Sequence, residues 1–153
     1  MMRTQEGEVL TAVVLAVFRA DGRLLEAGDG LVQHLGLTGA RWQTLGAVAM
    51  APEPLTAPRV AAVMGLTRQG AQKQLNVLTQ EGLLQQLRNP GHQKSPLYAL
   101  TSKGERIYQS AETAQAKWVN ALARDLPVAR LVTALEILEA LSERLESGRG
   151  ARR

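Results

Sequence analysis

The hydrophobic pattern of this chain changes its period along the sequence, and the first third predicts helix. From about residue 6 to residue 37, apolar side chains recur at intervals of three and four, with acidic residues near the start. The segment also contains three glycines that each cost about 1 kcal/mol relative to alanine inside a helix: Gly22, Gly28 and Gly30. The pattern therefore fits one kinked helix or two helices. Gly36, Thr38 and Gly39 then indicate a break and a new start.

Between residues 38 and 82 the pattern predicts three short helices joined by tight turns. The first spans about residues 40–49 and ends at the proline-containing segment 51–54. Thr56 is expected to cap the second helix, and Thr67 the third, which Gly82 ends. The side chains expected to face the core are Trp42, Leu45 and Val48, then Val60, Val63 and Met64, then Ala71, Leu75 and Leu78.

After Gly82 the period changes to that of strands. Two apolar-rich runs, residues 83–87 and 97–100, flank a loop that contains two prolines and a glycine. This arrangement is typical of a β-hairpin with a long tip. The hairpin would hold the loop, which includes three basic or titratable side chains, out in solvent.

Two further helices are predicted after the hairpin. Thr101 caps the first, residues 102 to about 124, and Pro127 separates it from the last, residues 128 to about 147. The last helix carries an apolar stripe at spacings of three and four: Leu131, Ala134, Leu138, Leu141 and Leu145. A helix that follows a complete domain has little of its own subunit left to cover such a stripe. We therefore expect a homodimer interface at Leu131, Leu138, Leu141 and Leu145, with an intramolecular core as the alternative.

Composition narrows the class of protein. Apolar residues make up 45% of the 153 residues but aromatic residues only 3%, so Leu, Val and Ala must build the core, which favours a mostly helical fold. The chain has no cysteine, which excludes disulfides, thiolate nucleophiles and Cys-ligated metals and indicates a reducing cytoplasm. The most apolar run, residues 9–18, covers about half of the roughly 20 residues that span a bilayer, and acidic residues precede it. We expect a soluble, cytoplasmic protein without membrane contact.

Positive charge is concentrated in the middle of the chain. Between Leu55 and Lys103 there are six basic residues and one acidic residue, Glu81, while the whole chain carries a formal charge of +4. A polyanion such as the phosphate backbone of DNA suits this concentration, because each neutralised phosphate releases bound counterions.

Helices joined by a turn and followed by a hairpin with a basic tip are the plan of a winged helix-turn-helix. The third short helix opens T-R-Q-G-A-Q-K-Q, and amide and guanidinium groups in its first two turns could reach base edges in the major groove. The residues expected to contact DNA from this helix are Thr67, Arg68, Gln69, Gln72, Lys73 and Gln74, with Thr67 directed to a phosphate. A merely solvated polar face is the alternative, and the neighbouring basic hairpin argues against it.

The loop R-N-P-G-H-Q-K-S-P, residues 88–96, is predicted to be the tip of the wing. The side chains expected to meet the adjacent minor groove or its phosphates are Arg88, His92, Lys94 and Ser95. Thr56 and Arg59, at the start of the second short helix, are expected to contact the DNA backbone.

A resemblance to a known family rests on three stretches: RWQTLGAV (residues 41–48), TAPRVAAVMGL (56–66) and GLTRQGAQKQLNVLTQEGLLQQLRNPGHQKSPLYALTSKGERIY (65–108). Together they resemble the MarR family of bacterial transcriptional regulators, and the L-T-x-x-G after the hairpin (Leu100, Thr101 and Gly104) is part of the match. The family's commoner wing tip carries an Asp and Arg pair that the segment 89–95 lacks, and Lys94 stands in for the arginine.

The resemblance implies an assembly as well as a domain. In that family the N- and C-terminal helices of two subunits interlock into a dimer, and the third short helix reads the major groove. A small-molecule effector often binds between the dimer base and the DNA-binding lobe. These features are expectations for this chain.

Other kinds of chemistry have less support. The two histidines, His34 and His92, lie in different predicted elements without the partners that a metal site needs. No nucleophile elbow or P-loop occurs, so we expect no catalytic residue, no cofactor and no enzymatic activity. The main alternative is a winged-helix module for protein interaction or dimerisation that does not bind DNA.

The sequence thus predicts a mostly α-helical winged helix-turn-helix protein with a small β-hairpin wing. We expect residues 38–104 to form the DNA-binding domain, and residues 1–37 and 105–153 to form a helical dimerisation region. The expected function is that of a ligand-responsive repressor that binds a pseudo-palindromic operator as a homodimer. The tail, residues 148–153, is expected to be disordered and to add weak attraction to DNA.

Overall fold

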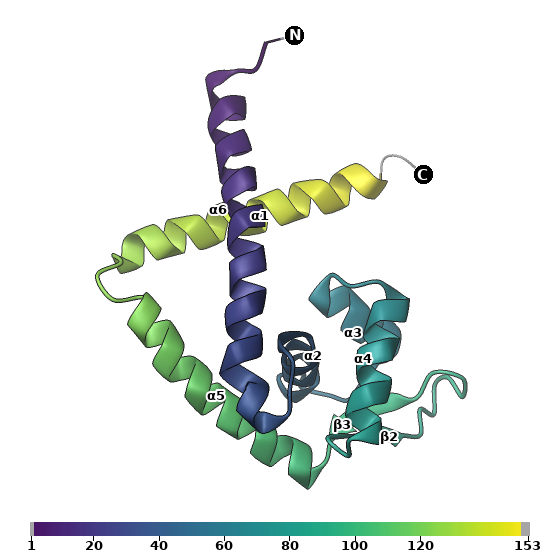
Figure 1. The fold of residues 1–153 in the computed structure, drawn as a ribbon. Helices are drawn as coiled ribbons and strands as arrows, with labels where there is room; N and C mark the ends of the chain where they lie inside the picture. Colours follow the sequence, from purple (N-terminus) through teal and green to yellow (C-terminus); the bar gives the residue numbers. More distant parts are fainter. Residues whose placement is uncertain (1, 151–153) are drawn as a thin grey trace. The chain divides into compact units, whose positions relative to one another are not determined.

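The computed structural model describes the backbone of residues 2–150 and the side chains of residues 2–148. The chain is divided into two compact units, residues 1–116 and residues 117–153. Figure 1 shows the helices and strands of both units along the chain. The described residues form six α-helices, a short 3₁₀ helix and one three-stranded sheet. Arg152, Arg153 and the side chain of Arg149, which belong to the predicted basic tail, lie outside the described residues.

The first third of the chain is one continuous helix, α1 (Gln5–Val32), which decides between the two alternatives that its glycines allowed. The Thr4 hydroxyl accepts a hydrogen bond from Gly7 N at 3.2 Å, and Glu6 and Glu8 lie in the positive first turn. Added side chains at Gly22 and Gly30 would meet no other atom within 4 Å. These two glycines therefore weaken the helix without breaking it.

A short 3₁₀ helix, η1 (Gln33–Leu35), and a left-handed Gly36 turn the chain into α2 (Gly39–Ala49). Two oxygens satisfy the free amides at the start of α2. The Thr38 hydroxyl accepts from Arg41 N at 3.3 Å, and a carboxylate oxygen of Asp29 in α1 accepts from Gly39 N at 2.5 Å. The second bond fixes the end of α1 against the start of α2.

The next two helices form the helix-turn-helix. They are α3 (Ala57–Met64) and α4 (Arg68–Gln80), and the turn between them passes through Gly65, whose φ of 64° suits glycine. Thr56 stands at the N-cap position of α3 as expected, but its side chain makes no capping hydrogen bond. The expectation that Val63 faces the core was wrong, because 62% of this residue is exposed.

The wing belongs to a three-stranded antiparallel sheet of order β1-β3-β2. Strands β2 (Leu84–Leu87) and β3 (Leu97–Leu100) form the predicted hairpin, in register from Leu84 opposite Leu100 to Leu87 opposite Leu97. The two-residue strand β1 (Leu55–Thr56) adds to the free edge of β3 and was not expected. Two residues are too few to show the alternation that identifies a strand in a sequence.

Helix α5 (Ser102–Leu122) starts directly after the sheet. The Thr101 hydroxyl accepts from Gly104 N at 3.0 Å and thereby caps the helix. Gly104 packs against the backbone of Leu83, where an added Cβ would overlap the Leu83 carbonyl group. The glycine of the L-T-x-x-G motif is thus required by the close contact between α5 and the start of the wing.

One hydrophobic core joins the helices and the sheet of the first unit. Its fully buried side chains come from every layer: Val32 of α1, Leu45 of α2, Val60 of α3, Leu75 and Leu78 of α4, Leu84 of β2, Tyr98 of β3 and Ala111 of α5. Tyr108 of α5 also lies in this core. Burial, with a smaller contribution from Glu112, raises the pKa of the Tyr108 phenol above its ordinary value, so the phenol stays neutral at physiological pH.

The second unit contains the end of α5 and the helix α6 (Val128–Gly150). α6 continues to Gly150, beyond the expected end near Ser147 and into the segment that was expected to be disordered. All of its described side chains are exposed except that of Leu141, which is half-buried. This helix therefore contributes little to a core within a single chain.

Candidate nucleic-acid interface

The position of α4 is set by the turn that precedes it. Gly65 closes α3 in the left-handed conformation, and the Leu66 amide donates back to the Ala61 carbonyl at 3.0 Å. The Thr67 hydroxyl then accepts from Gly70 N at 3.0 Å and caps α4. An added Cβ at Gly70 would lie 3.1 Å from that same hydroxyl oxygen, so glycine leaves room for the cap.

Helix α4 has a buried face and an exposed face. Ala71, Leu75 and Leu78 are completely buried, as their spacing predicted. Four of the six residues expected to contact DNA are exposed: Thr67, Arg68, Gln69 and Lys73. The buried face anchors the helix, so these side chains are presented from a fixed backbone.

The other two predicted contact residues of α4, Gln72 and Gln74, are half-buried. The Gln72 side-chain amide donates to Asn76 Oδ1 at 2.8 Å and to the hydroxyl of Tyr98 in β3 at 2.9 Å. Gln72 is therefore bonded within the protein in this structure.

The loop at the tip of the wing has an ordered frame of hydrogen bonds. Asn89 Nδ2 donates to the Ser95 carbonyl at 2.8 Å, and Asn89 Oδ1 accepts from Gly91 N at 3.1 Å. The backbone adds bonds from His92 N to the Asn89 carbonyl and from Ser95 N to the His92 carbonyl. Asn89 was not singled out in the sequence, although asparagine before Pro-Gly is a recognised turn signal.

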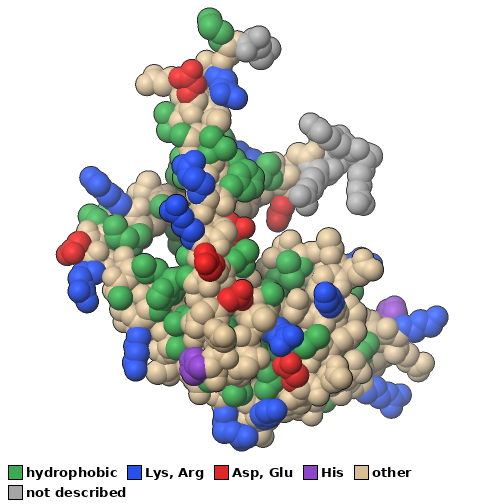
Figure 2. All heavy atoms as spheres, in the orientation of Figure 1, with side chains coloured by type: hydrophobic (Ala, Val, Ile, Leu, Met, Phe, Trp, Pro, Cys, Tyr) green, Lys and Arg blue, Asp and Glu red, His purple; other side chains and the backbone are tan. Residues whose placement is uncertain are grey.

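This frame exposes the charged side chains of the wing. Arg88, His92 and Lys94 are exposed, and Ser95 is half-buried. Figure 2 shows Lys and Arg side chains and a histidine gathered around the protruding hairpin tip. The wing thus presents cationic groups from a loop with defined geometry.

Two further predicted contact residues lie at the start of α3. Thr56 is half-buried in β1, where it pairs with Leu97 of the wing, and Arg59 is exposed on the first turn of α3. Strand β1 therefore joins this turn to the same sheet that carries the wing.

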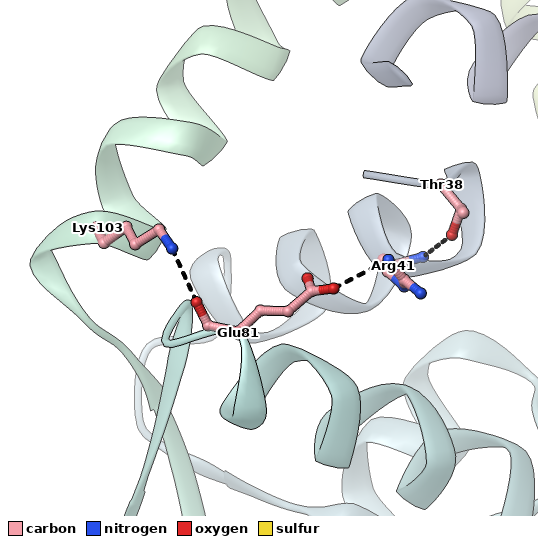
Figure 3. A network of polar contacts seen from close by, with 4 residues as sticks. All are labelled: Thr38, Arg41, Glu81 and Lys103. Atoms are coloured by element: carbon pink, nitrogen blue, oxygen red, sulfur yellow. Dashed lines mark hydrogen bonds and ion pairs between the residues drawn. The ribbon is translucent and has the colours of Figure 1, made fainter. Parts of the chain in front are cut away.

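The one acidic residue of the basic segment is neutralised. Glu81 Oε1 accepts from Arg41 Nη1 at 3.1 Å, and the Glu81 backbone carbonyl accepts from Lys103 Nζ at 2.9 Å (Figure 3). An exposed ion pair of this kind stabilises a protein by only about 0–1 kcal/mol. Its main consequence is electrostatic, because the only carboxylate between residues 55 and 103 is paired with a cation from α2. Sequence spacing could not reveal this pair, since 40 positions separate its members.

Comparison with known proteins decides the family. The profile of the MarR family matches residues 35–95. The uncharacterized protein Rv2011c of Mycobacterium tuberculosis is 39% identical over 101 residues, which cover 66% of this chain and 69% of that protein. The chain belongs to the MarR family.

Solved structures of MarR family proteins share the fold. A crystal structure of a MarR family transcription regulator superposes with a TM-score of 0.79 at 22% identity, covering 93% of each chain. The transcriptional repressor CouR, bound to a 23-mer DNA duplex, superposes with a TM-score of 0.76 at 23% identity, covering 92% of this chain and 99% of CouR. CouR from Rhodococcus jostii has also been solved bound to p-coumaroyl-CoA.

In this MarR family chain, the residues predicted for a dimer interface lie on α6. Leu131, Leu138 and Leu145 are exposed and Leu141 is half-buried. Large apolar side chains are also exposed along α1, among them Val9, Leu15 and Phe18. Adjacent exposed apolar side chains of this kind often mark surfaces that bind another protein chain.

The described residues of this MarR family chain contain neither a membrane-spanning helix nor a metal-binding cluster. Within residues 2–150, no helix is both long enough and apolar enough to cross a membrane. In the same part of the chain, no group of three His, Asp or Glu side chains is placed to hold a metal ion.

Proposed function

We propose that this chain is a sequence-specific, double-stranded DNA-binding transcriptional regulator that acts as a homodimer. The observation that carries the proposal is the exposed start of α4, anchored by its buried face, next to a wing whose ordered loop exposes three cationic or titratable groups. A major groove about 12 Å wide admits a helix of this kind. Membership of a family of transcription regulators supports the same role.

Each exposed side chain of α4 suits a particular part of the duplex. The fork of Arg68 matches the two acceptors of guanine, and the amide of Gln69 can bond a base edge. Lys73 suits a phosphate as a point charge. The Thr67 hydroxyl at the helix N-terminus can bond a phosphate, which the positive end of the helix dipole also attracts. Gln74, half-buried, would reach DNA only by its amide end.

The wing and the start of α3 would hold the protein on the duplex. We propose that Arg88, His92, Lys94 and Ser95 meet the adjacent minor groove or its phosphates, and that Thr56 and Arg59 contact the backbone. These contacts carry little sequence information by themselves. They fix the register in which α4 reads the bases.

The assembly in this proposal is a two-fold dimer. Residues 1–37 and 105–153 would supply the dimerisation region, with the α6 leucines at its centre, and residues 38–104 would supply the reading head. A symmetric dimer places its recognition helices about one helical turn apart, 34 to 36 Å, on a pseudo-palindromic operator. This spacing is a geometric requirement of the proposal.

We further propose that the regulator is a repressor released by a small molecule. An effector that binds one separation of the two reading heads better than another shifts the population towards that separation. The structures of CouR, one with DNA and one with p-coumaroyl-CoA, support a response of this kind in a related fold. Such a regulator needs no cofactor or catalytic residue, and it would act in the cytoplasm on the nucleoid.

A gel shift with fragments of the source genome at two salt concentrations tests the proposal. A DNA-binding regulator retains particular fragments. Retention weakens as the salt concentration rises, because the release of counterions from the DNA is then less favourable. A protein-interaction or dimerisation module, the alternative function, would retain no fragment at either concentration.

A further inference from the structure

Three side chains meet where the recognition helix approaches the wing. Tyr98 of β3 is 1% exposed, and its hydroxyl oxygen accepts two hydrogen bonds. One comes from Gln72 Nε2 of α4 at 2.9 Å and the other from Gln86 Nε2 of β2 at 3.1 Å. Gln86 lies directly opposite Tyr98 in the antiparallel register, so both wing strands and α4 contribute to this junction.

The hydrogen-bond inventory of Gln72 limits what it can offer to DNA. A primary amide has two N–H donors. In Gln72 one points to Tyr98 and the other to Asn76 Oδ1, at 2.8 Å. Glutamine reads adenine with an N–H donor and its carbonyl oxygen used together. That fork is unavailable while both N–H groups are bonded inside the protein.

We propose that Gln72, Gln86 and Tyr98 form an amide–phenol clamp that sets the position of α4 relative to the wing. In this proposal Gln72 is a positioning residue and not a base reader. The proposal rests on the function proposed above and deepens it, because the clamp matters only if α4 and the wing must reach neighbouring grooves together.

The clamp has a specific energetic signature. Phosphate contacts tolerate small movements of the protein, whereas bidentate base contacts require the helix and the wing in one relative position. Loss of the clamp should therefore weaken binding to a specific duplex and leave binding to an arbitrary duplex unchanged. A purely structural defect would weaken both.

The test uses the full-length chain and two DNA probes. One probe is the duplex that the unaltered protein enriches from a randomised library, and the other is a shuffled duplex of the same composition. Tyr98→Phe keeps the buried ring and removes the hydroxyl, and Gln86→Leu removes one donor from the surface of the wing. Gln85→Leu, a neighbouring exposed glutamine on the same strand, is the matched control.

The clamp predicts that Tyr98→Phe and Gln86→Leu each lower affinity for the enriched duplex roughly tenfold, the factor that corresponds to about 1.4 kcal/mol. Affinity for the shuffled duplex and the salt slope should stay at the parent values, as should both affinities of Gln85→Leu. The double variant should lose little more than Tyr98→Phe alone, because both changes open the same junction.

Three results would overturn the clamp. Unchanged or higher affinity of Tyr98→Phe for the enriched duplex would mean that Gln72 reads a base once it is released. Equal losses on both probes would indicate a structural role only. Additive losses in the double variant would show that Tyr98 and Gln86 act independently and do not form one clamp. If circular dichroism shows that Tyr98→Phe does not fold, the test rests on Gln86→Leu and its control Gln85→Leu. The quantity to compare is then the ratio of the affinities for the enriched and the shuffled duplex. If the unaltered protein enriches no duplex at all, the proposed function itself fails and the clamp fails with it.

Discussion

Arg68 and Gly104 occupy opposite environments, and each shows what a single residue contributes. Arg68 is exposed on the first turn of α4, where its charge and its fork of donors have no partner among the described hydrogen bonds and ion pairs. Gly104 is buried at the start of α5, where the backbone of Leu83 leaves no room for a side chain. Arg68 is therefore available for contact with a ligand, whereas Gly104 is needed for the packing of α5 against Leu83.

Arg68→Ala should weaken binding to an enriched duplex by about 1–3 kcal/mol and relax the base preference at one position. The reason is the loss of the proposed bidentate contact to guanine, since α4 carries no second arginine. Competition titration against duplexes with single base changes measures both effects. Arg19→Ala, which removes the same charge from an exposed position of α1, should change neither. Equal preferences in Arg68→Ala and the parent would show that Arg68 does not read a base.

Gly104→Ala should lower the free energy of unfolding by about 1–3 kcal/mol, the usual cost of overpacking. Gly22→Ala is the matched comparison, because its new methyl group meets open space within a helix. It should stabilise the protein by about 0.5–1 kcal/mol. Urea unfolding followed by circular dichroism measures both changes. A Gly104→Ala variant as stable as the parent would contradict the close contact between α5 and Leu83.

For single residues, the sequence predicted which side chains are buried better than it predicted their hydrogen-bond and ion-pair partners. The spacing of Ala71, Leu75 and Leu78 identified the buried face of α4 because helical periodicity is a local property. The pairing of Arg41 with Glu81 depends on how two helices pack and has no local signal. The bonds that hold Gln72 to Tyr98 have the same origin, 26 residues apart in sequence.

The elements of the reading head combine a rigid helix with an ordered loop. α4 is anchored by its buried face, and the wing tip by the bonds of Asn89. Most of these elements follow from the sequence, since threonine caps, glycine turns and apolar runs are local features. Strand β1 does not, because it exists only through its pairing with β3. Val63 is exposed because the buried side of α3 is the one that carries Ala57, Val60 and Ala61.

Lys94→Ala tests the wing as an element. It should weaken binding to enriched and shuffled duplexes alike and make the slope of log affinity against log salt shallower by about one unit. The reason is that a phosphate contact releases counterions without reading sequence. Lys117→Ala, which removes an exposed lysine from α5, should leave the slope unchanged. Parent-like titrations of Lys94→Ala at several salt concentrations would remove the wing tip from the proposed interface.

The proposed assembly contains a second copy of the chain. A single chain leaves the leucines of α6 and several large apolar side chains of α1 exposed, so the proposed dimer accounts for features that a monomer does not. The spacing of the α6 leucines predicted an apolar stripe on this helix, and three of its four predicted interface leucines are exposed in the structure.

Leu138→Glu should dissociate the homodimer. A two-fold interface contains the change twice, and each buried carboxylate should raise the dissociation constant by at least about tenfold. Sedimentation velocity over a range of concentrations measures the effect. Ala140→Glu places the same charge on another side of α6 and should leave the dimer intact. Dissociation by Ala140→Glu but not by Leu138→Glu would place the interface elsewhere on the helix.

The most direct test of a symmetric, groove-reading dimer is methylation interference on the duplex that the protein enriches. Methylation at guanine N7 blocks an acceptor that lies in the major groove. The expected result is two clusters of interfering guanines, related by two-fold symmetry and separated by about one helical turn, 34 to 36 Å. Binding that tolerates methylation at every guanine, or a single cluster without a symmetric partner, would contradict the reading of paired half-sites by two copies of α4.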